Sequence, residues 1–100
     1  MRWVFKVIDG PEAGRAFEWA GERIVLVGRA LHAHFRFRGD DPYMSELHCM
    51  LELGPGRCLL RDLDSTNGTL VNGKKVARAE LQGGDEIQLG KTTIKVQAIG

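Results

Sequence analysis

The sequence predicts an all-β domain, either a sandwich or a barrel, on two observations. Turn signals such as Asp9-Gly10-Pro11 and Gly54-Pro55-Gly56 recur along the chain at a spacing of about ten residues. The runs between these turns are short, rich in β-branched and aromatic residues, and several alternate apolar with polar side chains. Short runs separated in this way are typical of sandwiches and barrels.

The expected strands lie between these turns. The segment 75–81 contains good helix formers, but it stops at Gly83-Gly84 and is too short to stand as a helix by itself, so we assign it to a strand end and a loop. The remaining segments are expected to be strands at residues 3–8, 16–19, 24–27, 35–37, 49–53, 58–61, 69–71, 86–89 and 93–96.

Length and composition exclude several classes of protein. A chain of 100 residues with 43% hydrophobic and 27% charged residues suits one globular domain, spanning residues 1–100. No apolar run is long enough to span a membrane, and residues 1–6 lack the features of a signal peptide, so we expect a cytoplasmic protein. The net charge of +1 argues against nucleic acid as a partner. Because the chain stops just after its last strand, we expect a module of a longer protein.

The two cysteines flank one turn and are expected to remain free thiols. If that turn is centred near Pro55, Cys49 faces a residue near Arg61 and Cys58 one near Glu52. This register would leave the two sulfur atoms on opposite faces of the hairpin.

The segment 60–73 is unusually dense in turn residues. Asn67-Gly68 and Asn72-Gly73 bracket a very short strand. An isolated Asn-Gly pair usually marks only a hairpin tip. Here Ser65-Thr66-Asn67 places hydroxyl and amide groups just before the turn, and such donors suit an oxyanion or a peptide backbone.

A second candidate is Gly28-Arg29, directly after a buried strand. An arginine in this place is commonly a surface residue whose stem packs on the protein. Its alternative use is to bind phosphate, because the guanidinium group offers paired N–H donors and stays charged.

Ser45 and His48 could form a nucleophile and its base, but no third residue placed to orient the histidine is apparent. We therefore expect His48 to be a packed residue that bonds a neighbouring loop, and we do not expect an enzyme.

His32 and His34 could share a metal ion, yet too few further ligands are available for a structural zinc site. A surface loop without metal is the preferred interpretation.

Arg36 and Arg38 flank Phe37 and resemble an RNA-reading strand. Asp40 and Asp41 follow at once, and we expect them to cancel the local positive charge.

Taken together in this order and spacing, these motifs resemble the signature of the forkhead-associated (FHA) domain. The resemblance rests on Gly28-Arg29, Ser45-x-x-His48, Asp62-x-x-Ser65-Thr66-Asn67-Gly68-Thr69 and Asn72-Gly73, and it extends over essentially the whole chain. It implies a β-sandwich of about eleven mostly antiparallel strands that recognises phosphothreonine peptides through loops at one end.

The resemblance also implies roles for individual residues. Arg29 and Ser45 would hold the phosphate oxygens, Thr66 would add a hydroxyl or backbone contact, and Asn67 would bond the peptide main chain. The residues that would shape the loops are Gly28, His48, Asp62, Gly68, Asn72 and Gly73. No cofactor or metal is implied, and the partner would be a phosphothreonine-containing protein bound by a monomeric domain.

Two positions depart from the family pattern. Glu46 stands where the family usually has a basic or amide side chain, so its carboxylate would oppose phosphate if it points inward. His34 lies near where many relatives have an aspartate that braces the loop. Glu46 motivates an alternative function, a scaffold or oligomerisation module that acts without phosphate.

Overall fold

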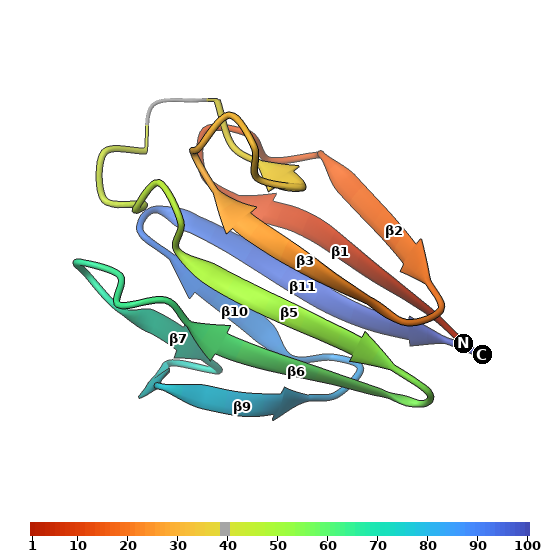
Figure 1. The fold of residues 1–100 in the computed structure, drawn as a ribbon. Helices are drawn as coiled ribbons and strands as arrows, with labels where there is room; N and C mark the ends of the chain where they lie inside the picture. The colour runs from red at the N-terminus through yellow and green to blue at the C-terminus, as the bar shows by residue number, and fades with distance from the viewer. Residues whose placement is uncertain (39–40) are drawn as a thin grey trace.

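A computed structural model describes residues 1–38 and 41–100, and it confirms the all-β prediction (Figure 1). In this part of the chain there are eleven strands and no helix, hence none that could cross a membrane. The strands are β1 (Arg2–Asp9), β2 (Ala16–Ala20), β3 (Arg23–Gly28), β4 (Phe35–Arg36), β5 (Cys49–Gly54), β6 (Arg57–Asp62), β7 (Thr69–Val71), β8 (Lys74–Val76), β9 (Arg78–Leu81), β10 (Glu86–Leu89) and β11 (Thr92–Ile99).

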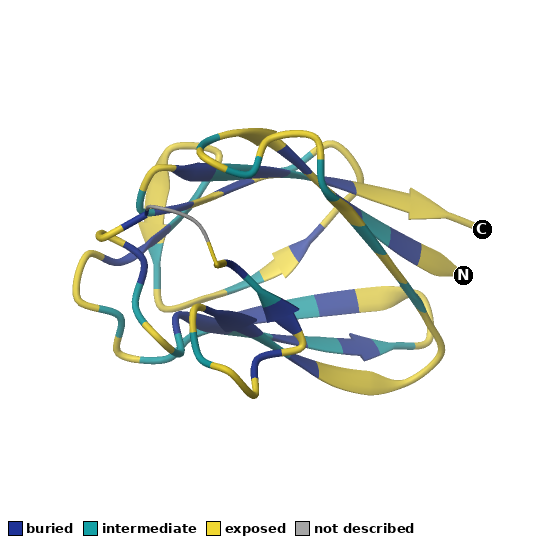
Figure 2. Ribbon diagram, turned by 90° about the horizontal axis from the view of Figure 1, so that it is seen from above, coloured by how far each residue is buried: buried dark blue, intermediate teal, exposed yellow. Residues whose placement is uncertain are grey.

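The strands form two sheets, in the order β2-β1-β11-β10-β7-β8 and β4-β3-β5-β6-β9. All the pairings are antiparallel except that of β3 with the two-residue strand β4, which is parallel. Viewed from above, the sheets lie as two layers (Figure 2). The mostly antiparallel sandwich is therefore confirmed.

The core lies between the sheets and follows from the alternation of side chains along each strand. In β5 every second residue is buried, beginning with Cys49, while its alternate residues are only half-buried. An aromatic cluster fills one side, where Phe35 packs 4.7 Å from Phe37 and 4.1 Å from Phe17, measured between ring centroids. This cluster fixes the short strand β4 and the loops on either side of it.

The β5–β6 hairpin corrects the expected position of the cysteines. Its turn consists of Pro55 and Gly56, with Gly56 at φ 68°, so Cys49 pairs with Asp62 and Cys58 with Leu53. This register is one residue away from the expected one, and a shift of one residue turns a side chain to the other face. Both cysteines consequently lie on the buried face, and not on opposite faces.

Both thiols are free, as expected, and both are buried. Burial raises the pKa of Cys58 to about 12 and raises that of Cys49 as well, with the nearby Asp62 carboxylate adding to the effect. Neither sulfur atom is therefore a reactive thiolate at neutral pH.

The segment 75–81 contains more strand than expected. It supplies the end of β8 and all of β9, with only Ala77 between them. β8 pairs with β7 in one sheet, whereas β9 pairs with β6 in the other. The chain thus crosses between the sheets here, and pairing in both sheets outweighs its helix-forming composition.

Candidate functional site

Three loops meet at the end of the sandwich opposite the chain termini (Figure 1). They follow β3, precede β5 and follow β6, and they carry all of the predicted motifs except Asn72-Gly73. Hydrogen bonds between the loops, described below, hold these motifs together.

Gly28 is a glycine because the loop before β5 crosses directly over it. A Cβ atom at this position would lie 2.1 Å from the main-chain oxygen of Glu46 and 3.0 Å from that of Ser45. The N–H groups of Arg29 and Ala30 donate to these same two oxygens, at 3.4 Å to Ser45 and 2.9 Å to Glu46. The absence of a side chain at Gly28 therefore lets the loop before β5 lie against the end of β3.

Arg29 is exposed, and one side of its guanidinium group is anchored. Its Nε donates to the main-chain oxygen of Met44 at 2.6 Å. Its two terminal nitrogens make no hydrogen bond or ion pair with any other described residue. The anchored group thus presents its remaining paired donors for an anion.

The Ser45 side chain connects two of the loops. Its Oγ accepts a hydrogen bond from the main-chain N–H of Thr66 at 3.0 Å. Because this bond uses a lone pair of the oxygen, the hydroxyl proton stays available to donate. Thr66 is exposed, and its hydroxyl makes no hydrogen bond with a described residue.

His48 is fully buried and bridges the same two loops, as the packed-histidine interpretation predicted. Its Nδ1 accepts the main-chain N–H of Ser45 at 3.0 Å, and its Nε2 lies 2.8 Å from the main-chain oxygen of Gly68. These partners require a neutral ring with its proton on Nε2. His48 bonds the backbone of Ser45, and the Ser45 hydroxyl bonds Thr66, so the two residues do not form a nucleophile and base pair.

Asp62 holds the loop after β6 in its shape. One carboxylate oxygen accepts the hydroxyl groups of Ser65 at 2.6 Å and Thr69 at 2.7 Å, and the other accepts the N–H of Ser65 at 3.1 Å. Partial burial acts to raise the pKa of Asp62, but these hydrogen bonds outweigh it and hold the pKa below its ordinary value. The Ser65 hydroxyl proton is therefore used inside the loop and is not available to donate to a phosphate.

Asn67 closes the connection between the loops. Its Nδ2 donates to the main-chain oxygen of Tyr43 at 3.0 Å, which leaves its side-chain oxygen exposed beside the loop before β5. Gly68 follows with φ 86°, a backbone conformation that favours glycine. A hollow of about 320 Å³ lies next to this turn, between Tyr43, Asn67, Gly68, Leu70, Gln88 and Gly90.

Two other predicted residues lie apart from this cluster. Asn72 and Gly73 form the β7–β8 turn, with φ 51° and 82°, at the far end of β7 from Asn67. The side chain of Asn72 accepts the N–H of Glu86 at 2.9 Å and donates to Asp85 at 3.0 Å. This turn shapes the sheet and does not contribute to the cluster of loops.

Glu46 lies in the loop before β5 with its side chain exposed. Its main-chain oxygen accepts the N–H of Ala30, as described above. Its carboxylate forms no ion pair with a described residue. The carboxylate is therefore an uncompensated negative charge on the rim of the site.

His34 braces the loop after β3, which the sequence left uncertain. Its Nδ1 accepts the main-chain N–H of Leu26 at 2.9 Å, so the side chain bonds the edge of β3 just before β4 begins to pair with that strand. No group of three or more potential metal ligands occurs in the described part of the chain. His34 thus acts as a hydrogen-bond acceptor for the backbone.

Asp41 was missed as a site residue, because the sequence analysis treated it only as a surface charge. It is 3% exposed, and its carboxylate accepts the N–H of Lys91 at 2.9 Å, the hydroxyl of Thr92 at 2.8 Å and the N–H of Tyr43 at 3.2 Å. It therefore ties the loop before β5 to the β10–β11 turn. Asp40, to which the analysis gave the same charge-cancelling role, lies outside the described residues.

The comparisons with known proteins agree with this arrangement. The sequence model of the FHA domain matches residues 25–90. Over 72 residues the chain is 39% identical to the FHA domain-containing protein FhaA of Mycobacterium tuberculosis, which covers 72% of this chain and 13% of FhaA. It is 37% identical over 82 residues to the glycogen accumulation regulator GarA of Mycolicibacterium smegmatis, covering 82% of this chain and 50% of GarA. The chain thus spans half or less of the length of these relatives.

Solved structures show the same likeness over nearly the whole chain. One, from work on phosphothreonine-dependent FHA domain interactions, has a TM-score of 0.90 and 32% identity, covering 100% of this chain and 99% of the other. The FHA domain of FhaA, in complex with an intracellular domain of another protein, has a TM-score of 0.84 and 35% identity, covering 95% and 99%. The fold, the loop motifs and the sequence match agree, and this chain belongs to the FHA domain family.

Proposed function

We propose that this domain binds phosphothreonine-containing segments of partner proteins and acts as an interaction module in kinase signalling. The observation that carries the proposal is the convergence of Arg29, Ser45 and Asn67 from three loops that are hydrogen-bonded to one another. A phosphate group carries a charge of about −1.5 to −2 at pH 7, and one guanidinium group with a few hydroxyl or amide donors satisfies it without a metal or cofactor.

Each residue has a distinct role in this proposal. The free nitrogens of Arg29 and the hydroxyl of Ser45 bind phosphate oxygens. The Thr66 N–H already bonds Ser45, so Thr66 contributes its hydroxyl. Asn67, held by Tyr43, offers its exposed side-chain oxygen to an N–H of the peptide backbone. His48 and Gly68 position these groups and do not contact the ligand.

Glu46 weakens this binding in the proposal. At about 6 Å from the phosphate and an effective dielectric constant of about 20, a carboxylate opposes binding by about 3 kcal/mol for each unit of charge on the phosphate, and solvent and salt reduce this for an exposed group. The substitution Glu46→Gln removes this charge and keeps the shape of the side chain. It is therefore expected to raise the affinity for a phosphothreonine peptide by a factor of a few.

The test uses fluorescence anisotropy with labelled peptide pools, because the preferred sequence is not known. The pools carry phosphothreonine, phosphoserine or unmodified threonine at one fixed position, with the neighbouring positions randomised. The phosphothreonine pool is expected to bind, and the unmodified pool is not. Arg29→Ala is expected to lower the affinity at least tenfold because it removes the only guanidinium group in the proposed phosphate set.

Arg61→Ala is the matched control. Arg61 is exposed on β6, outside the three loops, and it forms no ion pair with a described residue. Binding is also expected to weaken as pH falls below about 6, where phosphate loses its second charge, and as salt is added. Equal binding of the phosphorylated and unmodified pools, or full binding by Arg29→Ala, would contradict the proposal.

The alternative, a scaffold or oligomerisation module that acts without phosphate, has one observation in its favour. The outer face of the second sheet carries an apolar group, in which Ile24 is 55% exposed and Leu26 lies opposite the half-buried Met50. A complex with an unmodified partner that survives both Arg29→Ala and Ser45→Ala would favour this function.

Three further points belong to the proposal. We place the domain in the cytoplasm, where protein kinases supply its ligands, and its two unpaired thiols suit a reducing compartment. We expect residues 1–100 to act as one monomeric unit. The greater lengths of FhaA and GarA support the expectation that this unit is a module of a longer protein. Size-exclusion chromatography with light scattering tests the monomeric state.

A further inference from the structure

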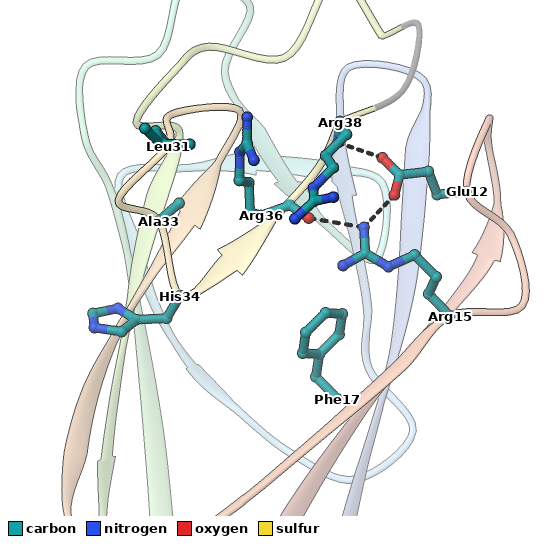
Figure 3. A pocket seen from close by; sticks show the side chains of 8 residues that line it. All are labelled: Glu12, Arg15, Phe17, Leu31, Ala33, His34, Arg36 and Arg38. Atoms are coloured by element: carbon teal, nitrogen blue, oxygen red, sulfur yellow. Dashed lines mark hydrogen bonds and ion pairs between the residues drawn. The ribbon is translucent and has the colours of Figure 1, made fainter.

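A second hollow, of about 610 Å³, lies beside the proposed phosphate site on the side of the loop after β3. Figure 3 shows side chains from residues 12–17 and from residues 31–38 around it. Its apolar wall consists of Phe17, Leu31 and Ala33, and the polar residues that line it are Glu12, Arg15, His34, Arg36 and Arg38.

Glu12 and Arg15 build the frame of this hollow. Arg15 Nη1 forms an ion pair with Glu12 and also donates to the main-chain oxygen of Arg36 at 2.8 Å. The other oxygen of Glu12 accepts the main-chain N–H of Arg38 at 2.7 Å. The guanidinium carbon of Arg15 lies 4.7 Å from the ring centroid of Phe17. The negative charge of Glu12 is therefore engaged by the frame itself.

Arg36 and Arg38 supply positive charge that the frame does not neutralise. Neither guanidinium group forms an ion pair with any residue in the described part of the chain. From its place in the sequence, Asp41 is expected to help cancel these charges. Instead Asp41 is buried and directed toward Lys91 and Thr92. Among the described residues that line this hollow, three arginines consequently face one glutamate.

The hollow is connected directly to the proposed phosphate site. Arg36 Nε lies 3.5 Å from the main-chain oxygen of Arg29 and donates to it weakly. The cationic group of Arg36 therefore sits next to the backbone of the residue that we expect to bind phosphate. An extended peptide advances about 3.3 Å per residue, so a side chain about two to four residues from the phosphothreonine can reach the hollow.

We propose that this hollow is a second anion-binding site, which takes a phosphorylated or carboxylate side chain of the same peptide. Arg36 and Arg38 bind the anionic group, and Phe17, Leu31 and Ala33 contact the aliphatic part of that side chain. The inference rests on the proposed phosphothreonine binding and adds to it a preference for partners that are acidic or phosphorylated at a second position. A phosphate is favoured over a carboxylate, because two guanidinium groups match a dianion.

The test compares peptides that share one phosphothreonine and differ at one other position. That position is placed two, three or four residues before or after the phosphothreonine and carries phosphoserine, glutamate or alanine. Isothermal titration calorimetry measures each affinity. We expect phosphoserine at the best position to bind about tenfold more tightly than alanine, and glutamate to give a smaller gain.

The variants assign this gain to the hollow. Arg38→Gln is the first, because the side chain of Arg38 is exposed and makes no hydrogen bond with a described residue, so its loss does not disturb the frame. The double variant Arg36→Gln/Arg38→Gln is the second. The gain from phosphoserine is expected to shrink in Arg38→Gln and to disappear in the double variant. The matched control is Arg61→Gln/Arg78→Gln, which removes two exposed arginines from the outer sheet face and is expected to keep the gain.

The outcomes separate the two proposals. If the wild-type domain binds the peptide with alanine at the second position, but phosphoserine gives no gain or the gain persists in the double variant, the second site is overturned and phosphothreonine binding stands. If no phosphothreonine peptide binds at all, the proposed function fails and the second site fails with it. Thermal unfolding confirms that each variant is folded before its affinity is interpreted.

Discussion

A methyl group on Gly28 would lie 2.1 Å from the main-chain oxygen of Glu46, well inside van der Waals contact. Gly28→Ala therefore has to push the loop that carries Ser45 away from β3. We expect a loss of about 1–3 kcal/mol in the free energy of unfolding, as for an overpacked core. We also expect weaker binding of phosphothreonine peptides, because Ser45 and Arg29 move apart. Urea unfolding and peptide anisotropy measure the two effects.

Gly54→Ala is the control for this prediction. A Cβ atom on Gly54 has the Arg57 side chain as its nearest neighbour, at 3.9 Å, and the residue has no positive φ. This substitution is expected to leave peptide affinity unchanged and to alter stability by less than Gly28→Ala does. Equal stability and affinity of Gly28→Ala and the wild type would show that the loop does not depend on this close approach.

His48→Ala is expected to destabilise the domain and to loosen the two loops together. The substitution leaves the N–H of Ser45 and the main-chain oxygen of Gly68 without their partner in a buried place. The expected cost is about 2–4 kcal/mol, from the unpaired groups and the cavity. Faster hydrogen exchange of the Ser45 amide would report the loosened loop. His32→Ala, at an exposed position, is the control, and an unchanged Ser45 exchange rate in His48→Ala would contradict the bridging role.

The hydrogen bonds of Asp62 predict a pH dependence of stability. The folded state lowers the pKa of this carboxyl, so its contribution to stability is complete above the ordinary pKa of about 4. The contribution is lost as pH falls through the lowered folded pKa. Urea unfolding of the wild type and Asp62→Asn, measured from pH 7 down to pH 3, is expected to show the gap between them narrowing below about pH 4. Parallel curves over this range would mean that Asp62 is not the group responsible.

Much of the fold could be predicted from local pattern. The runs around Val25, Leu51 and Ile87 alternate or are continuously apolar, and glycine-rich turns bound them, so their strands follow from short-range information. The hairpin register was missed by one residue, because the position of the turn at Pro55-Gly56 decides which face each side chain takes. The crossing between the sheets at Ala77 was missed because it depends on pairing with distant strands.

For the candidate site too, one part could be predicted and another could not. The motifs that contain Arg29, Ser45 and Asn67 resemble the FHA signature, and it is this resemblance that predicts their association. The partners that hold them could not be predicted, since these are mostly main-chain atoms such as the oxygens of Met44 and Tyr43. Their positions depend on how the loops fold over one another.

Asp41 illustrates what the sequence could not reveal. It contacts Lys91 and Thr92, which lie 50 and 51 residues further along the chain, and nothing near Asp41 in the sequence indicates that the carboxylate turns inward. Its burial changes the expected charge balance around Arg36 and Arg38. The positive hollow therefore became visible only from the tertiary structure.

Asp41→Asn tests this inward anchor. The carboxylate oxygen that accepts both the Lys91 N–H and the Thr92 hydroxyl becomes an amide nitrogen in one orientation, and in the other the remaining oxygen loses its charge. We expect a loss of about 1.5–3 kcal/mol in stability, the range for hydrogen bonds to a charged group, measured by urea unfolding. Peptide affinity is also expected to fall, because Tyr43, which holds Asn67, belongs to the same loop.

Asp64→Asn is the matched control for the anchor, since it makes the same chemical change at an exposed residue. Asp64 has φ 54°, a conformation that asparagine adopts as readily as aspartate. The free energy of unfolding of Asp64→Asn is expected to stay close to that of the wild type. If Asp41→Asn and Asp64→Asn lose equal stability, the effect comes from removing a negative charge from the domain in general. If only Asp41→Asn is destabilised and binds peptide more weakly, the tie between the loop before β5 and the β10–β11 turn positions the ligand-binding loops.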